Sequence, residues 1–125
     1  MAEGHTYLRT HDLSAEHMLI RLGDAVTELS GLTNAGDDRR AITLVRQGGL
    51  SVVLTRVAKD GSLEEHSAPG AVTVHVLDGK VRMTVGDETL EATGGDLIAF
   101  DSGVRHSVHA LEDATLLLTL AMPKS

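Results

Sequence analysis

The residues best placed to do chemistry in this sequence are His66 and His106, because each borders a turn beside a short apolar run. His66 precedes the turn formers at 67–70, and His106 follows the Asp-Ser-Gly turn at 101–103. If the two turns lie side by side, their imidazoles converge on one site, and imidazole is a common ligand of transition metals. A tight metal site needs about three protein ligands, so a third donor is required.

His75 is the first candidate for that third donor. In the run Ala71 to Leu77, alternation places Val72 and Val74 on one face of a strand and His75 on the other. We expect Val72 and Val74 to line the pocket. On this register His75 points away from it, to a subunit interface or a hydrogen bond within the sheet. A bulge near Pro69-Gly70 would instead turn His75 inward.

The elements that must position these residues change character near residue 40. The apolar spacing over 14–29 predicts a helix with Ser14 as its N-cap, and the turn formers at 30–40 predict a loop. We therefore expect an N-terminal extension over 1–40 and a β barrel over 41–125, within one structural domain. The predicted strands are 41–46, 50–58, 71–77, 80–85, 88–92, 97–100, 106–110 and 114–121.

Composition narrows the classes of function. The 125 residues carry a net charge of −7, which argues against nucleic acid and anionic membrane surfaces as partners. The absence of cysteine excludes disulfides and thiolate chemistry. Neither a signal peptide nor an apolar run long enough to cross a membrane stands out, so we expect a soluble, cytoplasmic protein.

The turns before His106 resemble the second motif of the cupin family, Gly-x5-Pro-x-Gly-x2-His-x3-Asn. Gly95, Gly103 and His106 match this motif at the family spacing. Asp101 stands at the position where proline is usual, and Ala110 stands at the asparagine position.

The region around His66 resembles the first cupin motif, His-x-His-x3–4-Glu-x6-Gly. His66 matches the first histidine and Gly79 the closing glycine, whereas Ala68 replaces the second histidine. Val72, or Thr73 with the longer spacing, occupies the glutamate position. The resemblance thus keeps the scaffold glycines but only His66 and His106 of the usual ligands.

The resemblance implies an all-β, double-stranded β-helix, an RmlC-like jelly-roll barrel with a short N-terminal helix, often dimeric and with its pocket lined by the two motifs. Gly79, Gly95 and Gly103 would form its turns. The first hypothesis for function is a binding protein for a small, mainly apolar molecule carrying one polar or anionic group, with weak or no metal binding. Fold alone does not settle function.

The second hypothesis is a metal-dependent cupin enzyme, dioxygenase-like or isomerase-like. It would hold Fe, Mn, Ni or Zn through His66, His106 and a non-standard ligand such as His75. A third is a structural dimer module, suggested by the doubly apolar run at 116–120. We expect a homodimer with the N-terminal helix or the outer sheet at or near its interface.

Overall fold

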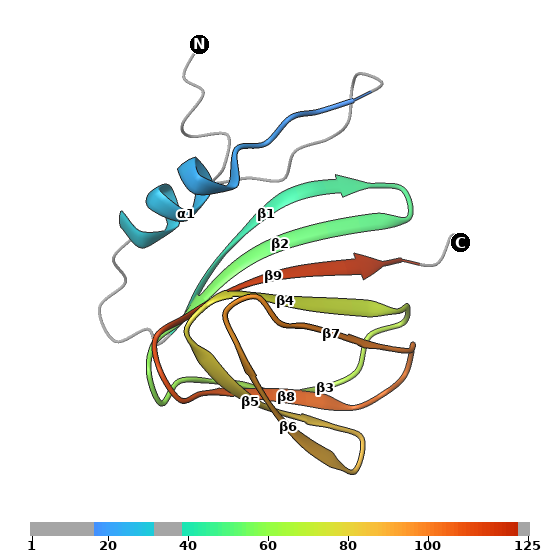
Figure 1. The fold of residues 1–125 in the computed structure, drawn as a ribbon. Helices are drawn as coiled ribbons and strands as arrows, with labels where there is room; N and C mark the ends of the chain where they lie inside the picture. The colour runs from blue at the N-terminus through green and yellow to red at the C-terminus, as the bar shows by residue number, and fades with distance from the viewer. Residues whose placement is uncertain (1–16, 32–38, 123–125) are drawn as a thin grey trace.

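A computed structural model describes residues 17–31 and 39–122, apart from the side chains of Arg39, Glu65 and His66. Its elements, in chain order, are α1 (Leu22–Gly31), β1 (Arg39–Gln47), β2 (Leu50–Val57), β3 (Ser62–His66), β4 (Val72–Asp78), β5 (Lys80–Val85), β6 (Glu88–Thr93), β7 (Leu97–Phe100), β8 (His106–Ala110) and β9 (Ala114–Ala121). The strands build a five-stranded sheet, β1-β2-β9-β4-β7, and a four-stranded sheet, β3-β8-β5-β6 (Figure 1).

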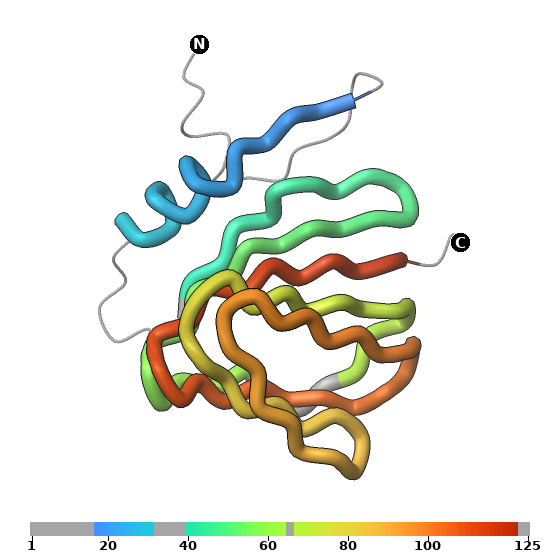
Figure 2. The backbone as a smooth tube through the Cα atoms, viewed as in Figure 1, coloured from blue at the N-terminus to red at the C-terminus, as the bar shows by residue number. Residues whose placement is uncertain are grey.

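The two sheets curve toward each other around a common interior (Figure 2). Strands remote in sequence become neighbours, with β9 between β2 and β4 and β8 between β3 and β5, and these pairs are antiparallel. Such interleaved pairing is the jelly-roll arrangement. The predicted all-β fold with a short N-terminal helix is confirmed.

Strand alternation fills the interior. In β4, Val72, Val74 and Val76 are 3%, 1% and 0% exposed, whereas the residues between them are partly exposed. They pack with apolar side chains from both sheets, among them Val57, Val81, Met83, Phe100, Val108, Ala110 and Leu116. Full burial of a valine or leucine side chain stabilises the folded state by about 1.5–3 kcal/mol. This single aliphatic core holds the two sheets together.

Helix α1 covers part of the outer face of the five-stranded sheet. Its fully buried residues, Ala25 and Leu29, pack in a second cluster with Ile42, Leu44 and Leu54 of β1 and β2. The helix therefore protects one end of this face and leaves the other end uncovered. Among the described residues, no helix combines the length and the apolar character that crossing a membrane requires.

The helix begins later than the sequence pattern predicts. The predicted start at Ser14 lies outside the described residues, and residues 17–21 are not helical. The first helical bonds run from Asp24 and Ala25 N–H to the Arg21 carbonyl, both at 3.1 Å. Leu19 is 75% exposed, so the first part of the apolar stripe gains no burial that would stabilise a helix there.

The strand β3 (Ser62–His66) was not predicted, because its sequence Ser-Leu-Glu-Glu-His shows no apolar alternation. It is an edge strand and pairs with β8 alone. Backbone bonds from Asp60 N–H to the Ala110 carbonyl (2.8 Å) and from Ala110 N–H to the Gly61 carbonyl (2.9 Å) begin this pairing. The eight predicted strands all appear close to their expected bounds.

Candidate functional site

One end of the barrel interior is sealed and the other is partly open. Inner residues at the sealed end, such as Val57, Val76 and Leu116, are fully buried. At the opposite end several inner-facing apolar residues are only partly buried. We call this set, with Phe100 and His106, the barrel mouth; its partly buried members are Val85, Ile98, Val104, Leu118 and Leu120.

His106 is the polar side chain that the structure places in this apolar wall. It is the first residue of β8 and is 6% exposed. Its ring lies against Phe100 from the opposite sheet, with centroids 4.4 Å apart and an interplanar angle of 44°. Apolar neighbours and an aromatic face surround the imidazole and hold its position.

A backbone contact sets the tautomer of His106. Its Nδ1 lies 3.1 Å from the carbonyl oxygen of Val104. A carbonyl only accepts hydrogen bonds, so Nδ1 carries the proton and donates it. In the neutral ring the lone pair is then on Nε2, the nitrogen suited to accept a hydrogen bond or to bind a metal.

The loop before His106 is held by short contacts. Gly103 N–H donates to the Ala68 carbonyl at 2.8 Å, joining this loop to the loop that follows His66. The Asp101 carboxylate accepts a hydrogen bond from Ser102 N–H at 2.7 Å, and Val104 N–H donates to the Asp101 carbonyl at 3.4 Å, which closes the turn. The two turns thus lie side by side, which is the condition under which the imidazoles of His66 and His106 could converge.

His66 and His106 are cross-strand partners in the β3–β8 ladder, so their backbones are adjacent. A register shift between Leu63 and His66 precedes this pair. The orientation of the His66 side chain lies outside the described residues. The adjacency that the structure describes is therefore that of the two backbones and not that of the two imidazole rings.

His75 is not brought to the mouth. It pairs with Leu97 and Leu117, and its neighbours Val74 and Val76 point into the core, so His75 is on the outer face of the sheet. The β4–β7 ladder is regular at His75, without the bulge that would turn it inward. Among the described side chains, no group of three histidine or acidic residues could hold a metal ion.

The other predicted site residues take distinct places. Val72 and Val74 face the interior, and Val72 pairs directly with Phe100 at the mouth. The turn residues Gly79, Gly95 and Gly103 have φ angles of +89°, +98° and +78°. Residues that carry a side chain rarely adopt such backbone φ angles, which explains why glycine stands at these positions.

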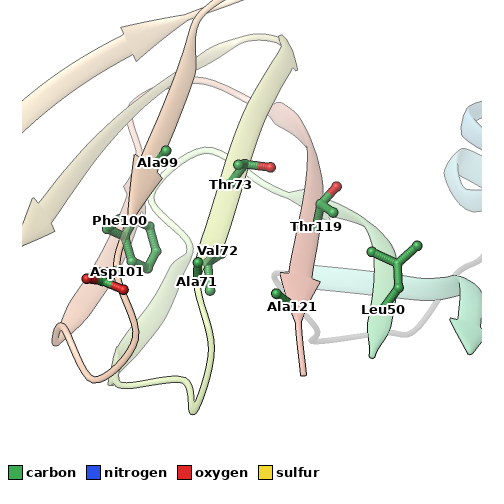
Figure 3. Close-up of a pocket in the computed structure, with 9 residues that line it drawn as sticks. All are labelled: Leu50, Ala71, Val72, Thr73, Ala99, Phe100, Asp101, Thr119 and Ala121. Atoms are coloured by element: carbon green, nitrogen blue, oxygen red, sulfur yellow. The ribbon is translucent and has the colours of Figure 1, made fainter. Parts of the chain in front are cut away.

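Sequence reasoning missed a groove of about 480 Å³ on the outer face of the five-stranded sheet. Figure 3 shows it across β2, β9, β4 and β7, beyond the end of the face that α1 covers. Its lining residues are Leu50, Ala71, Val72, Thr73, Ala99, Phe100, Asp101, Thr119 and Ala121. The signal in the sequence was weak: small residues at alternate positions of three separate strands.

Known proteins share parts of this sequence and of this fold. Residues 53–122 match the family model described as the cupin domain. No curated protein matches the chain significantly. Among solved structures, a conserved protein of unknown function from Streptococcus pyogenes is 26% identical, with a TM-score of 0.71 over 89% of this chain and 93% of that protein.

Two further structures are similar. KdgF from Halomonas sp. is 16% identical, with a TM-score of 0.63 over 74% of this chain and 86% of that protein. A variant of oxalate decarboxylase from Bacillus subtilis is 25% identical, with a TM-score of 0.65 over 75% of this chain and 28% of that protein. The barrel topology and the family match over most of the strands lead to one conclusion: the chain belongs to the cupin family.

Proposed function

We propose that this cupin binds a small molecule at the barrel mouth, with His106 as the polar anchor. The observation that carries the proposal is the 6% exposed imidazole, which lies among apolar side chains in the part of the mouth that the structure describes. Ligand sites are typically apolar and carry a few polar groups that fix orientation. His106 has this role because the Val104 carbonyl and the Phe100 ring hold it in one orientation.

The lining defines the ligand chemistry. Ile98, Leu118 and Leu120 offer aliphatic surface, on which each buried CH₂ group contributes about 0.8 kcal/mol. When protonated, the imidazole donates from Nε2 to an anionic group; when neutral, Nε2 accepts a hydrogen bond from a polar group that carries a donor. A small, mainly apolar molecule with one carboxylate or similar group fits both features.

Nuclear magnetic resonance of the histidine side chains tests this proposal. Straight-chain carboxylates from butyrate to octanoate, titrated into the protein, should shift the His106 ring resonances until the site is saturated. The dissociation constant should fall as the carboxylate chain lengthens. In His106→Ala, binding is followed at the Phe100 ring resonances, and their shift should no longer saturate. His109→Ala is the matched control, because His109 lies on the same strand with a side chain 42% exposed. A series that leaves the His106 resonances unchanged refutes the proposal for this ligand class.

The second candidate is a metal-dependent enzyme. It is favoured by the backbone pairing of His66 with His106, and by similarity to Bacillus subtilis oxalate decarboxylase, for which Mn(II) centres are described. That structure is 28% identical over 67% of this chain and 25% of its own length. His75 does not complete a ligand set, since it is on the outer face, and the described side chains supply no group of three ligands. We therefore place this candidate second.

Metal analysis separates the two candidates. Untagged protein, exchanged against Fe(II), Mn(II), Ni(II) or Zn(II) and then desalted, should retain less than one equivalent if the mouth is a metal-free pocket. Stoichiometric metal that is lost in His106→Ala but kept in His109→Ala would establish the metal site and overturn the metal-free reading. Metal retained in both variants would place any ion away from His106.

A further inference from the structure

The outer face of the four-stranded sheet carries a serine, a histidine and an aspartate in one line. Ser62 of β3 and His109 of β8 are cross-strand partners, and Ser62 Oγ lies 3.1 Å from His109 Nδ1. At the other ring nitrogen, Asp60 Oδ1 lies 3.9 Å from His109 Nε2. A hydroxyl, an imidazole and a carboxylate in this order are the parts of a nucleophile, its general base and the group that supports the base.

The backbone holds these three residues next to one another. Because Ser62 and His109 are opposite in an antiparallel ladder, their Cβ atoms are about 4.5–5.5 Å apart. Bonds from Asp60 N–H to the Ala110 carbonyl (2.8 Å) and from Ala110 N–H to the Gly61 carbonyl (2.9 Å) tie the turn before β3 to the residue after His109. Among the described residues other than glycine, Asp60 alone has a positive φ, +70°. Unfavourable backbone conformations of this kind cluster at functional sites.

The charges around His109 suit the transfer of a proton to its ring. When the Ser62 hydroxyl donates to Nδ1, the proton of the neutral ring is on Nε2, the nitrogen beside Asp60. If Nδ1 takes the hydroxyl proton, the ring becomes a cation next to the Asp60 carboxylate, which stabilises it. On the other side of His109, its cross-strand partner Arg82 also carries a positive charge, but Glu91 lies 3.6 Å from the Arg82 guanidinium and offsets that charge.

We propose that Ser62 is the nucleophile of a second site, which hydrolyses small activated esters with His109 as general base and Asp60 as positioning residue. In the first step Ser62 Oγ bonds to the acyl carbon, its proton passes to His109 Nδ1, and the leaving alcohol or phenol takes that proton. In the second step water adds to the acyl carbon, its proton passes through Nδ1 to Ser62 Oγ, and the carboxylic acid leaves. This site does not depend on the barrel mouth, because His106 and His109 are on opposite faces of β8.

The position and exposure of the site define its substrate class. Among the described strands, β8 is the one neighbour of β3, so backbone N–H groups on the free side of this edge strand can donate to the oxyanion that forms on the acyl group. Ser62 is exposed, and the side chains of His109 and Asp60 are 42% and 77% exposed. Little of a substrate is buried at such a surface, so binding of its remote parts contributes little to the rate. The ester must therefore bring a good leaving group, as phenyl esters do.

Reaction of the full chain with p-nitrophenyl acetate tests the proposal. Wild type should release p-nitrophenol, and peptide mapping after a brief reaction should find an acetyl group on Ser62. Ser62→Ala should remove the acetyl group from that peptide. His109→Gln should lower the rate of Ser62 acetylation roughly 100-fold, the lower end of what a general base contributes. Ser107→Ala is the matched control, because Ser107 is on the same face of β8 as His109 but is the cross-strand partner of Thr84, and it should leave the rate unchanged.

Asp60→Asn tests the positioning residue without disturbing the turn, because asparagine also tolerates a positive φ. The maximal rate of Ser62 acetylation should fall about threefold to fivefold, as expected for the loss of one exposed charge pair. The ester concentration at half-maximal rate and the urea midpoint of unfolding should stay as in wild type, which a merely structural role for Asp60 would not produce. Acetyl groups on amino groups but not on Ser62, an acetylation rate indifferent to His109→Gln, or a rate unchanged in Asp60→Asn would each overturn the proposal.

Discussion

The ring centroids of Phe100 and His106 lie 4.4 Å apart, with the ring planes tilted by 44°, although Phe100 belongs to β7 of one sheet and His106 to β8 of the other. Phe100 is the only phenylalanine in the sequence. It pairs with Val72 in the five-stranded sheet and is 8% exposed. This contact therefore joins the two sheets at the barrel mouth and sets the plane in which the imidazole presents Nε2.

Replacing Phe100 with alanine should lower the free energy of unfolding by about 3–5 kcal/mol, because a buried aromatic side chain leaves a void in an aliphatic core. Urea denaturation measures this change. Leu90→Ala, at a 38% exposed position, should cost less than about 1 kcal/mol. Equal losses in the two variants would show that Phe100 is not a joint between the sheets.

The tautomer of His106 is a second testable consequence. Since Nδ1 lies 3.1 Å from the Val104 carbonyl, the neutral ring should be protonated at Nδ1, in contrast to the Nε2-protonated form favoured in free histidine. Long-range ¹H–¹⁵N correlation spectra above the titration range report this directly. His109 is the internal comparison, because its Nδ1 lies 3.1 Å from the Ser62 hydroxyl, which can donate or accept. An Nε2–H signal for His106 would contradict the described hydrogen bond.

Most of the barrel could be predicted from sequence because its strands alternate or are bounded by glycine turns. The valines of β4 show this clearly: residues 72, 74 and 76 face the core as their spacing indicates. β3 escaped prediction because an edge strand with one partner needs no apolar alternation, and its pairing comes from the distant strand β8. The start of the helix was predicted too early for a related reason, since spacing alone does not show whether Leu19 is buried.

The candidate site could be predicted only in part. The family resemblance implies that the two histidine-bearing loops line one pocket, and Gly103 N–H donates to the Ala68 carbonyl between these loops. The choice for His75 between pocket and outer face depended on whether β4 has a bulge, which local sequence does not encode. The outer groove was missed because its floor combines residues of several strands that become neighbours only after folding.

The turn at Gly79 should be far less tolerant of a side chain than the turn at Gly86. Both have positive φ, +89° and +60°, but a Cβ at Gly79 would lie 2.2 Å from the Asp113 carbonyl oxygen, whereas Gly86 has open space. Gly86→Ala should cost about 1–2 kcal/mol, the backbone penalty alone. Gly79→Ala should cost about 3 kcal/mol or more, because backbone must also move. Urea denaturation measures the loss in free energy of unfolding for both variants. Equal losses would mean that the 78–80 and 113–114 segments shift apart freely.

Helix α1 should contribute to stability through one residue above all. Leu29 is fully buried against β1 and β2, so Leu29→Ala should lower the free energy of unfolding by about 2–5 kcal/mol. Leu22→Ala, on the same helix at 36% exposure, should cost less than about 1 kcal/mol. Far-ultraviolet circular dichroism during urea denaturation follows both variants. If Leu29→Ala unfolds at the wild-type midpoint, α1 does not add to the barrel's stability, and the second apolar cluster is then only a surface contact.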